Sequence, residues 1–174
     1  LKFKYKIGII VVVSTICLIV AGITSFFYLS ESNKMLDDMY DNQLIPVRTV
    51  EEIQNNVTSG NLLAIRIITE KNHDKQLKLK DELAGFSGDT SKLFNSLNSF
   101  KTDEETEQFI KNVLEDRETY KAERAKVLDI AYFGNNDEAM NQYMKTVEPL
   151  VKKYRNDCDK LIEIYMNKAK AANE

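Results

Sequence analysis

The amino-terminal part of this chain contains a long uncharged segment, Ile7–Leu29, which limits where the chain can fold. Its length of about 23 residues is enough for one helix to cross a bilayer, which takes about 20 mostly apolar residues. Three basic residues and no acidic residue precede it: Lys2, Lys4 and Lys6. Because basic flanks stay in the cytoplasm, the sequence predicts a cytoplasmic segment over residues 1–6, a transmembrane helix over 7–29 and an extracellular or periplasmic part over 30–174.

A cleaved signal peptide is the alternative interpretation of this segment. The apolar part of a signal peptide is about 7–15 residues long and ends at a site of small residues. The uncharged segment is longer and ends on bulky residues: Phe26, Phe27, Tyr28 and Leu29. Both features favour an uncleaved transmembrane helix.

Residues 30–174 have the size of one soluble domain and an acidic balance. The whole chain has 24 basic and 27 acidic residues, so this part carries a net charge of about −6 once the N-terminal lysines are left out. Nucleic-acid binding needs a basic surface, so the acidic net charge of residues 30–174 argues against this function. Cys17 and Cys158 lie on opposite sides of the predicted membrane boundary, so they do not form a disulfide framework.

The sequence after Leu29 shows the periodicity of helices rather than of strands. Apolar residues return every three or four positions, and only Pro46 and Pro149 are prolines. Short turns divide this region into four predicted helices: about 30–71, 75–100, 103–133 and 136–174. We therefore predict an all-α, antiparallel up-down-up-down four-helix bundle, whose first helix is continuous with the transmembrane helix.

Apolar stripes mark the face that each helix is expected to bury. In the first helix the stripe is Val50, Ile53, Val57, Gly60, Ala64 and Ile67. In the third helix it is Phe109, Val113, Tyr120, Val127 and Ala131, with a polar middle formed by Asp116, Arg117, Glu123 and Arg124. In the fourth helix it is Met140, Met144, Val147, Val151, Tyr154, Cys158, Leu161 and Tyr165.

Capping and helix-breaking residues predict local features of these helices. Thr102 and Glu105 match a capping box that starts the third helix. Gly134 is suited to the left-handed residue that ends it.

Prolines and glycines inside the predicted helices indicate where a helix bends or breaks. Pro46 and Pro149 each lie inside a long helix, where a proline costs about 3 kcal/mol or kinks the helix. Gly85 and Gly88 weaken the second helix and make a local break there possible.

Residues for catalysis or metal binding are sparse. Glu70 and His73 have the Glu-x-x-His spacing of di-iron bundles, but such sites need two of these motifs and further carboxylates. His73 is the only histidine, which leaves no Ser-His or Cys-His pair. Cys158 falls on the core stripe, where a buried inert thiol is expected. We therefore predict no enzyme activity, no cofactor and no bound metal.

Several features together resemble a known family. The first helix carries Leu44-Ile45-Pro46-Val47-Arg48, and the turn Gly134-Asn135-Asn136-Asp137-Glu138-Ala139 opens a fourth helix that contains Pro149. With the uncharged span before the bundle, this pattern is similar to the four-helix-bundle sensor domain of methyl-accepting chemotaxis proteins. The same sensor module also occurs on histidine kinases and cyclases, and a ligand-free anchored structural bundle is the alternative from another class.

The resemblance implies how such a protein works. It implies a homodimeric membrane receptor that binds a small molecule across the subunit interface. The ligand site would lie between the first and fourth helices at the membrane-distal end. Ligand occupancy would cross the membrane as a small displacement of one helix.

The residues of the first helix provide an independent argument for a dimer. At about 100° per residue, the face opposite the core stripe carries apolar as well as polar side chains. A helix that is apolar on two sides usually has a second partner, although single surface leucines are also common. The predicted dimer contact comprises Leu44, Arg48, Leu62 and Ile65.

Arg66 is the predicted centre of the ligand site, because a guanidinium group offers two parallel donors to a carboxylate. The ligand is therefore expected to be small and anionic. Neighbouring ligand-binding candidates are Asn55, Ser59 and Thr69 on the first helix and Gln142, Tyr143 and Thr146 on the fourth.

The last residues of the sequence are good helix formers, from Lys168 to Asn173. Matched helix lengths bring this end back toward the membrane. We expect a second transmembrane helix within about ten residues, followed by a cytoplasmic signalling module and its partners.

Overall fold

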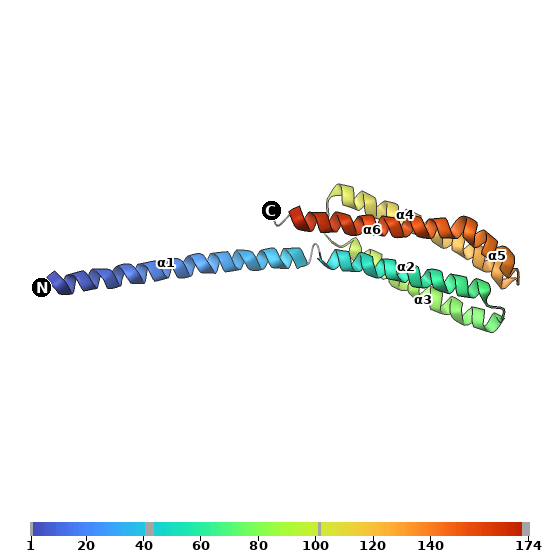
Figure 1. The fold of residues 1–174 in the computed structure, drawn as a ribbon, viewed down its shortest axis with the longest axis horizontal. Coiled ribbons are helices and arrows are strands. Elements are labelled where there is room, and N and C mark those ends of the chain that lie inside the picture. Colours follow the sequence, from blue (N-terminus) through green and yellow to red (C-terminus); the bar gives the residue numbers. More distant parts are fainter. Residues whose placement is uncertain (1, 41–43, 101, 172–174) are drawn as a thin grey trace. The chain divides into compact units, whose positions relative to one another are not determined.

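The computed structural model describes residues 2–40, 44–100 and 102–171, with the side chains of 2–5, 10, 11 and 38 left out of the description. Every secondary-structure element in this part of the chain is helical, which confirms the all-α prediction (Figure 1). The chain divides into two compact units, residues 1–40 and 41–174.

The first unit is one helix, α1 (Lys2–Met39). Within it, Lys6–Asp37 is apolar and long enough to cross a membrane, and no other helix in the described ranges meets both conditions. The predicted transmembrane residues 7–29 fall inside this segment. The predicted continuity between this helix and the bundle depends on residues 41–43, which lie outside the described residues.

The second unit is an antiparallel bundle whose successive rods alternate in direction (Figure 1). The rods are α2 (Ile45–Thr69), α3 (His73–Leu97), α4 (Glu104–Tyr132), and a last rod made of α5 (Asn136–Gln142), the π-helical turn η2 (Tyr143–Val147) and α6 (Glu148–Ala171). α2 packs mainly against α3 and α6, and α4 packs mainly against α5 and α6, which confirms the predicted four-helix bundle. Residues 30–39, expected in the first bundle helix, belong to α1, and residues 172–174 lie outside the description.

The core of the bundle follows the apolar stripe predicted for the first helix. All six residues of that stripe are buried. Large aromatic side chains from the other helices complete the core, among them Phe94 from α3, Tyr120 from α4, and Tyr154 and Tyr165 from α6. Burial raises the pKa of the Cys158 thiol to about 12, so this cysteine is an unreactive core residue at neutral pH.

The N-terminus of α4 differs from the prediction by one residue. The capping residue is Asp103 rather than Thr102, and its carboxylate accepts from the Thr106 backbone N–H at 2.9 Å and from the Thr106 hydroxyl at 2.6 Å. Lys168 of α6 also contacts this carboxylate at 2.6 Å. The Lys168 hydrogen bond holds the pKa of Asp103 well below its usual range. A carboxylate is favoured here over a hydroxyl because it carries a full charge at the positive end of a helix.

The two prolines occupy positions that tolerate the missing N–H group. Pro46 lies in the first turn of α2, where the N–H has no helical partner anyway. Pro149 is the second residue of α6, one residue after η2, where the Glu148 N–H bonds to the Tyr143 carbonyl five residues back. The last rod therefore continues through Pro149, whereas residues 41–43 before Pro46 lie outside the described residues.

The π-helical turn also corrects the inward stripe of the fourth helix. Met144 is 53% exposed and Met140 is only half-buried, whereas Ala139 and Tyr143 are buried. The extra residue in the turn shifts the inward face by one position on its N-terminal side. From Val151 to Tyr165 the predicted stripe is confirmed.

The possible break at Gly85 and Gly88 does not occur, because α3 is continuous through both residues. A Cβ atom added at either position would meet nothing within 4 Å. We expect Gly85→Ala and Gly88→Ala each to stabilise the bundle by about 0.5–1 kcal/mol, because alanine loses less backbone entropy on folding. Thermal melting of the variants followed by circular dichroism measures this gain.

Gly134→Ala is the matched control for these two substitutions. Gly134 has φ +84°, the left-handed conformation predicted for the end of the third helix. Alanine is strained there, so this variant should melt below the parent chain. A higher melting temperature for Gly134→Ala, or a lower one for both Gly85→Ala and Gly88→Ala, would contradict the backbone conformations described for these glycines.

Candidate functional site

The side of α2 opposite its core stripe is exposed along most of its length. We call this surface, formed by Leu44, Arg48, Asn55, Leu62, Arg66 and Thr69, the outer face of α2. Leu62 is 58% exposed although it is apolar. Arg66 makes no ion pair within the part of the chain that the structure describes, whereas Arg48 pairs with Glu52 of the same helix at 3.3 Å. Ser59 and Ile65, also predicted on this side, are half-buried at its margin.

The candidate residues of the fourth helix lie in and beside η2, which is joined to the C-terminal half of α2 by a hydrogen bond. The Tyr143 hydroxyl donates to the Asn61 side-chain oxygen at 2.7 Å, so Tyr143 is a buried link between the two helices. Gln142 and Thr146 are half-buried, and the Thr146 hydroxyl donates to the Gln142 carbonyl at 3.1 Å. The structure therefore joins Tyr143 to Asn61, which lies in the half of α2 that also contains Arg66.

Asn55 and Thr69 have other surroundings. Asn55 lines a shallow groove between α2 and α3, together with Asp89 and Lys92. The Thr69 hydroxyl donates to the Ile65 carbonyl of its own helix at 3.0 Å. Asn55 thus faces α3 rather than η2, and the ligand role of each of these residues stays a prediction.

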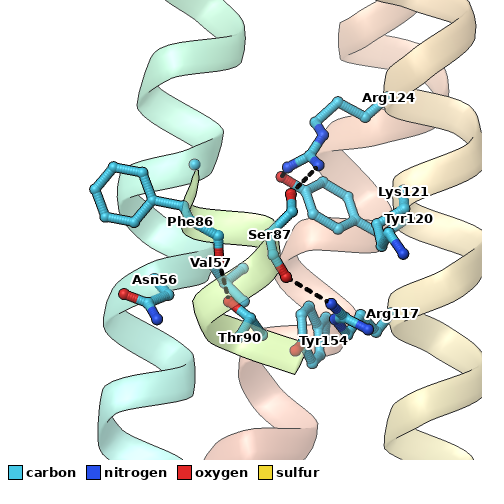
Figure 2. Close-up of a pocket in the computed structure, with 11 residues that line it drawn as sticks. Asn56, Val57, Phe86, Ser87, Thr90, Arg117, Tyr120, Lys121, Arg124 and Tyr154 are labelled. Atoms are coloured by element: carbon cyan, nitrogen blue, oxygen red, sulfur yellow. Dashed lines mark hydrogen bonds between the residues drawn. The ribbon is translucent and has the colours of Figure 1, made fainter. Parts of the chain in front are cut away.

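A second polar site lies inside the bundle, and the sequence reasoning missed it. Arg117 and Arg124 of α4 are only 6% and 9% exposed. Arg117 donates to the Ser87 carbonyl at 3.0 Å (Figure 2). It also donates to the Ser91 hydroxyl at 2.6 Å. Arg124 donates to the Ser87 hydroxyl at 3.1 Å and to the Tyr120 hydroxyl at 3.0 Å. Ser87 of α3 therefore binds both guanidinium groups, one through its backbone and one through its side chain.

These arginines surround a cavity of about 20 Å³ between α2, α3, α4 and α6. None of its described lining residues is exposed: Asn56, Val57, Gly60, Phe86, Ser87, Thr90, Arg117, Tyr120, Lys121, Arg124 and Tyr154 (Figure 2). Burial raises the pKa of Tyr120 and of Tyr154, so both hydroxyls stay protonated at neutral pH. An added Cβ atom on Gly60 would lie 3.5 Å from the Arg124 guanidinium, which shows how closely α2 approaches it.

The spacing along α4 contained a signal for this burial. Arg117 and Arg124 continue the alternating three- and four-residue spacing of Val113, Tyr120 and Val127, so they occupy inward positions of the helix. From the sequence, their charge predicts only a polar middle of the third helix. Their burial depends on partners from α3, which lie far away in the sequence.

An apolar helix of membrane length and a four-helix bundle are the architecture that the sequence resemblance predicts. The model of the family described as the four helix bundle sensory module for signal transduction matches residues 1–174. The chain belongs to this family, and the match confirms the resemblance drawn from the sequence. The search of curated proteins found no match.

Proposed function

We propose that this chain is the extracytoplasmic ligand-sensing part of a transmembrane chemoreceptor, held in the cell membrane by α1 with its amino end in the cytoplasm. Membership of a sensory family and the membrane-length helix support this proposal. The observation that carries it is the outer face of α2, where exposed Leu44 and Leu62 accompany Arg66, which has no ion-pair partner among the described residues. Exposed apolar residues on a helix that already has a buried face are typical of an interface.

The partner of this face is a second copy of the chain. A two-fold symmetric contact places the same α2 surface on both subunits, so Leu62 and Ile65 meet their own counterparts. Arg48 and Leu44 extend the contact toward the start of α2. This arrangement leaves Arg66, near the C-terminal end of α2, at one edge of the interface.

The proposed ligand is a small carboxylate bound by Arg66. The guanidinium group binds the carboxylate, while Gln142 and Thr146 supply further polar groups. Only a ligand that binds one helix arrangement better than another shifts the equilibrium between them. Exposed hydrogen bonds link α2 to α6, such as Gln54 to Asp159 at 2.7 Å. Exposed polar links cost little to break, and the response is a small axial displacement of the last rod relative to α2.

A thermal-shift screen of amino acids and organic acids tests the proposal. We expect one class of carboxylates to raise the melting temperature of the chain, because a ligand that binds only the folded state stabilises it. In the Arg66→Ala variant the apparent affinity for that class should fall at least several-fold, while the melting temperature without ligand stays nearly unchanged. The exposed position of Arg66 explains the unchanged stability.

Arg155→Ala is the matched control, since Arg155 is an exposed arginine of α6 that lies outside the proposed dimer contact. This variant should keep the response to the ligand. An unaltered response in Arg66→Ala would remove Arg66 from the site. The absence of a response to any carboxylate would favour an anchored structural bundle over direct sensing.

A further inference from the structure

The cavity inside the bundle is lined by cationic side chains and tyrosine hydroxyls, together with the polar side chains of Asn56, Ser87 and Thr90. Arg124 uses two of the five N–H groups of its guanidinium, on Tyr120 and on Ser87. The buried Tyr154 hydroxyl has no hydrogen-bond partner among the described residues. The Tyr120 oxygen already accepts from Arg124, which leaves the Tyr120 O–H to donate. Arg124, Tyr154 and Tyr120 therefore each bring an N–H or O–H group to the same cavity, and these groups need a hydrogen-bond acceptor.

The charged side chains that line the cavity, among the described residues, are all positive. Arg117, Lys121 and Arg124 line it, and no carboxylate does among the lining residues that the structure describes. Glu118, which lies outside the lining, binds Arg117 at 2.8 Å and Lys121 at 2.9 Å. Arg124 has no acidic partner in the described ranges. A buried charge without a partner is costly, and a nearby negative charge offsets that cost.

The size of the cavity limits what it can hold. Its volume of about 20 Å³ is close to the roughly 10–15 Å³ that one water molecule needs. An amino acid or an organic acid does not fit, so this is not the carboxylate site proposed above. A water molecule carries no net charge, whereas three cationic side chains line the cavity beside the smaller polar groups of Asn56 and Thr90. A monatomic anion matches the lining better because it only accepts.

We propose that the cavity between Arg117, Arg124 and Tyr154 binds a monatomic anion of the size of chloride. The anion accepts hydrogen bonds from the Tyr154 hydroxyl and from the arginines. It also links α4 to α6 and lies against α2 and α3, which supply the rest of the lining. Bound chloride therefore stabilises the packing of all four bundle helices. This inference is independent of the ligand proposed for Arg66.

Thermal melting of the chain of residues 1–174 in detergent micelles tests the proposal. Sodium chloride is replaced stepwise by sodium gluconate at constant ionic strength, because gluconate is too large for the cavity. We expect a saturable rise in melting temperature with chloride, of about 3–6 °C at ten times the dissociation constant. Circular dichroism follows the transition, since the chain has no tryptophan.

Tyr154→Phe removes the unpartnered hydroxyl and keeps the ring. In this variant most of the chloride-dependent rise in melting temperature should disappear. In gluconate alone the variant should melt at or above the parent chain, since it no longer buries an unsatisfied hydroxyl. The order of the two melting temperatures should therefore reverse between the two salts.

Tyr165→Phe is the matched control. Tyr165 also buries a hydroxyl without a partner among the described residues, but it does not line the cavity. This variant should keep the full response to chloride. An equal rise in the parent chain and in Tyr154→Phe would indicate a general salt effect and overturn the proposal. The absence of any rise would equally overturn it, and would leave the cavity to water.

Discussion

Replacing Phe94 by alanine should destabilise the bundle by about 3–5 kcal/mol, the usual cost of removing a buried aromatic side chain. Phe94 is 2% exposed and lies on α3. The Arg117 guanidinium lies 5.7 Å from the centre of its ring, so the substitution also removes a cation–π contact. The melting temperature should fall by roughly 6–20 °C, measured by circular dichroism.

Phe133 offers a matched control of the same residue type. It is 86% exposed and follows the last turn of α4. Phe133→Ala should change the free energy of unfolding by no more than about 0.5 kcal/mol. Similar melting temperatures for the two variants would mean that α3 does not pack on the core as described.

Replacing Leu62 by glutamate should weaken the proposed homodimer at least tenfold. In a two-fold symmetric interface one substitution acts twice, and it places two carboxylates near each other where two leucines meet. Analytical ultracentrifugation of the detergent-solubilised chain measures the dissociation constant. Because Leu62 is 58% exposed in the single chain, the fold itself should keep its melting temperature in the monomeric state.

The control for this experiment is Leu77→Glu on α3. Leu77 is also an exposed leucine, but it lies on a different helix from the proposed contact. Its substitution should leave dimerisation unchanged. Equal dissociation constants for Leu62→Glu and the parent chain would exclude the outer face of α2 from the interface, whatever the oligomeric state.

Much of the fold could be predicted from the sequence because helix periodicity is a local property. The spacing of Val50, Ile53 and Val57 identifies a buried stripe without any knowledge of its partners. The fourth helix shows the limit of this reasoning. A strict three-and-four spacing placed Met144 inward, but the π-helical turn before Pro149 changes the number of residues per turn. Periodicity alone does not reveal such a turn.

The candidate sites were predictable to different degrees. The exposure of Leu62 and Arg66 follows from their position opposite the stripe, so these placements could be read from α2 alone. The burial of Arg117 and Arg124 could not, because Ser87 and Ser91 supply the hydrogen bonds from another helix. A charged residue in a core position is ambiguous until its distant partners are known.

The π-helical turn has a consequence for comparing this chain with other members of its family. Tyr143–Val147 holds one residue more than an α-helical turn, so a relative with an unbroken α-helix here is one residue shorter at this place. If the two sequences are aligned without a gap, every position before the turn is rotated by about 100° relative to its true counterpart. Core positions of the relative are then matched to Met140 and Met144, whereas their structural equivalents are Ala139 and Tyr143. A one-residue gap within 143–147 restores the correspondence.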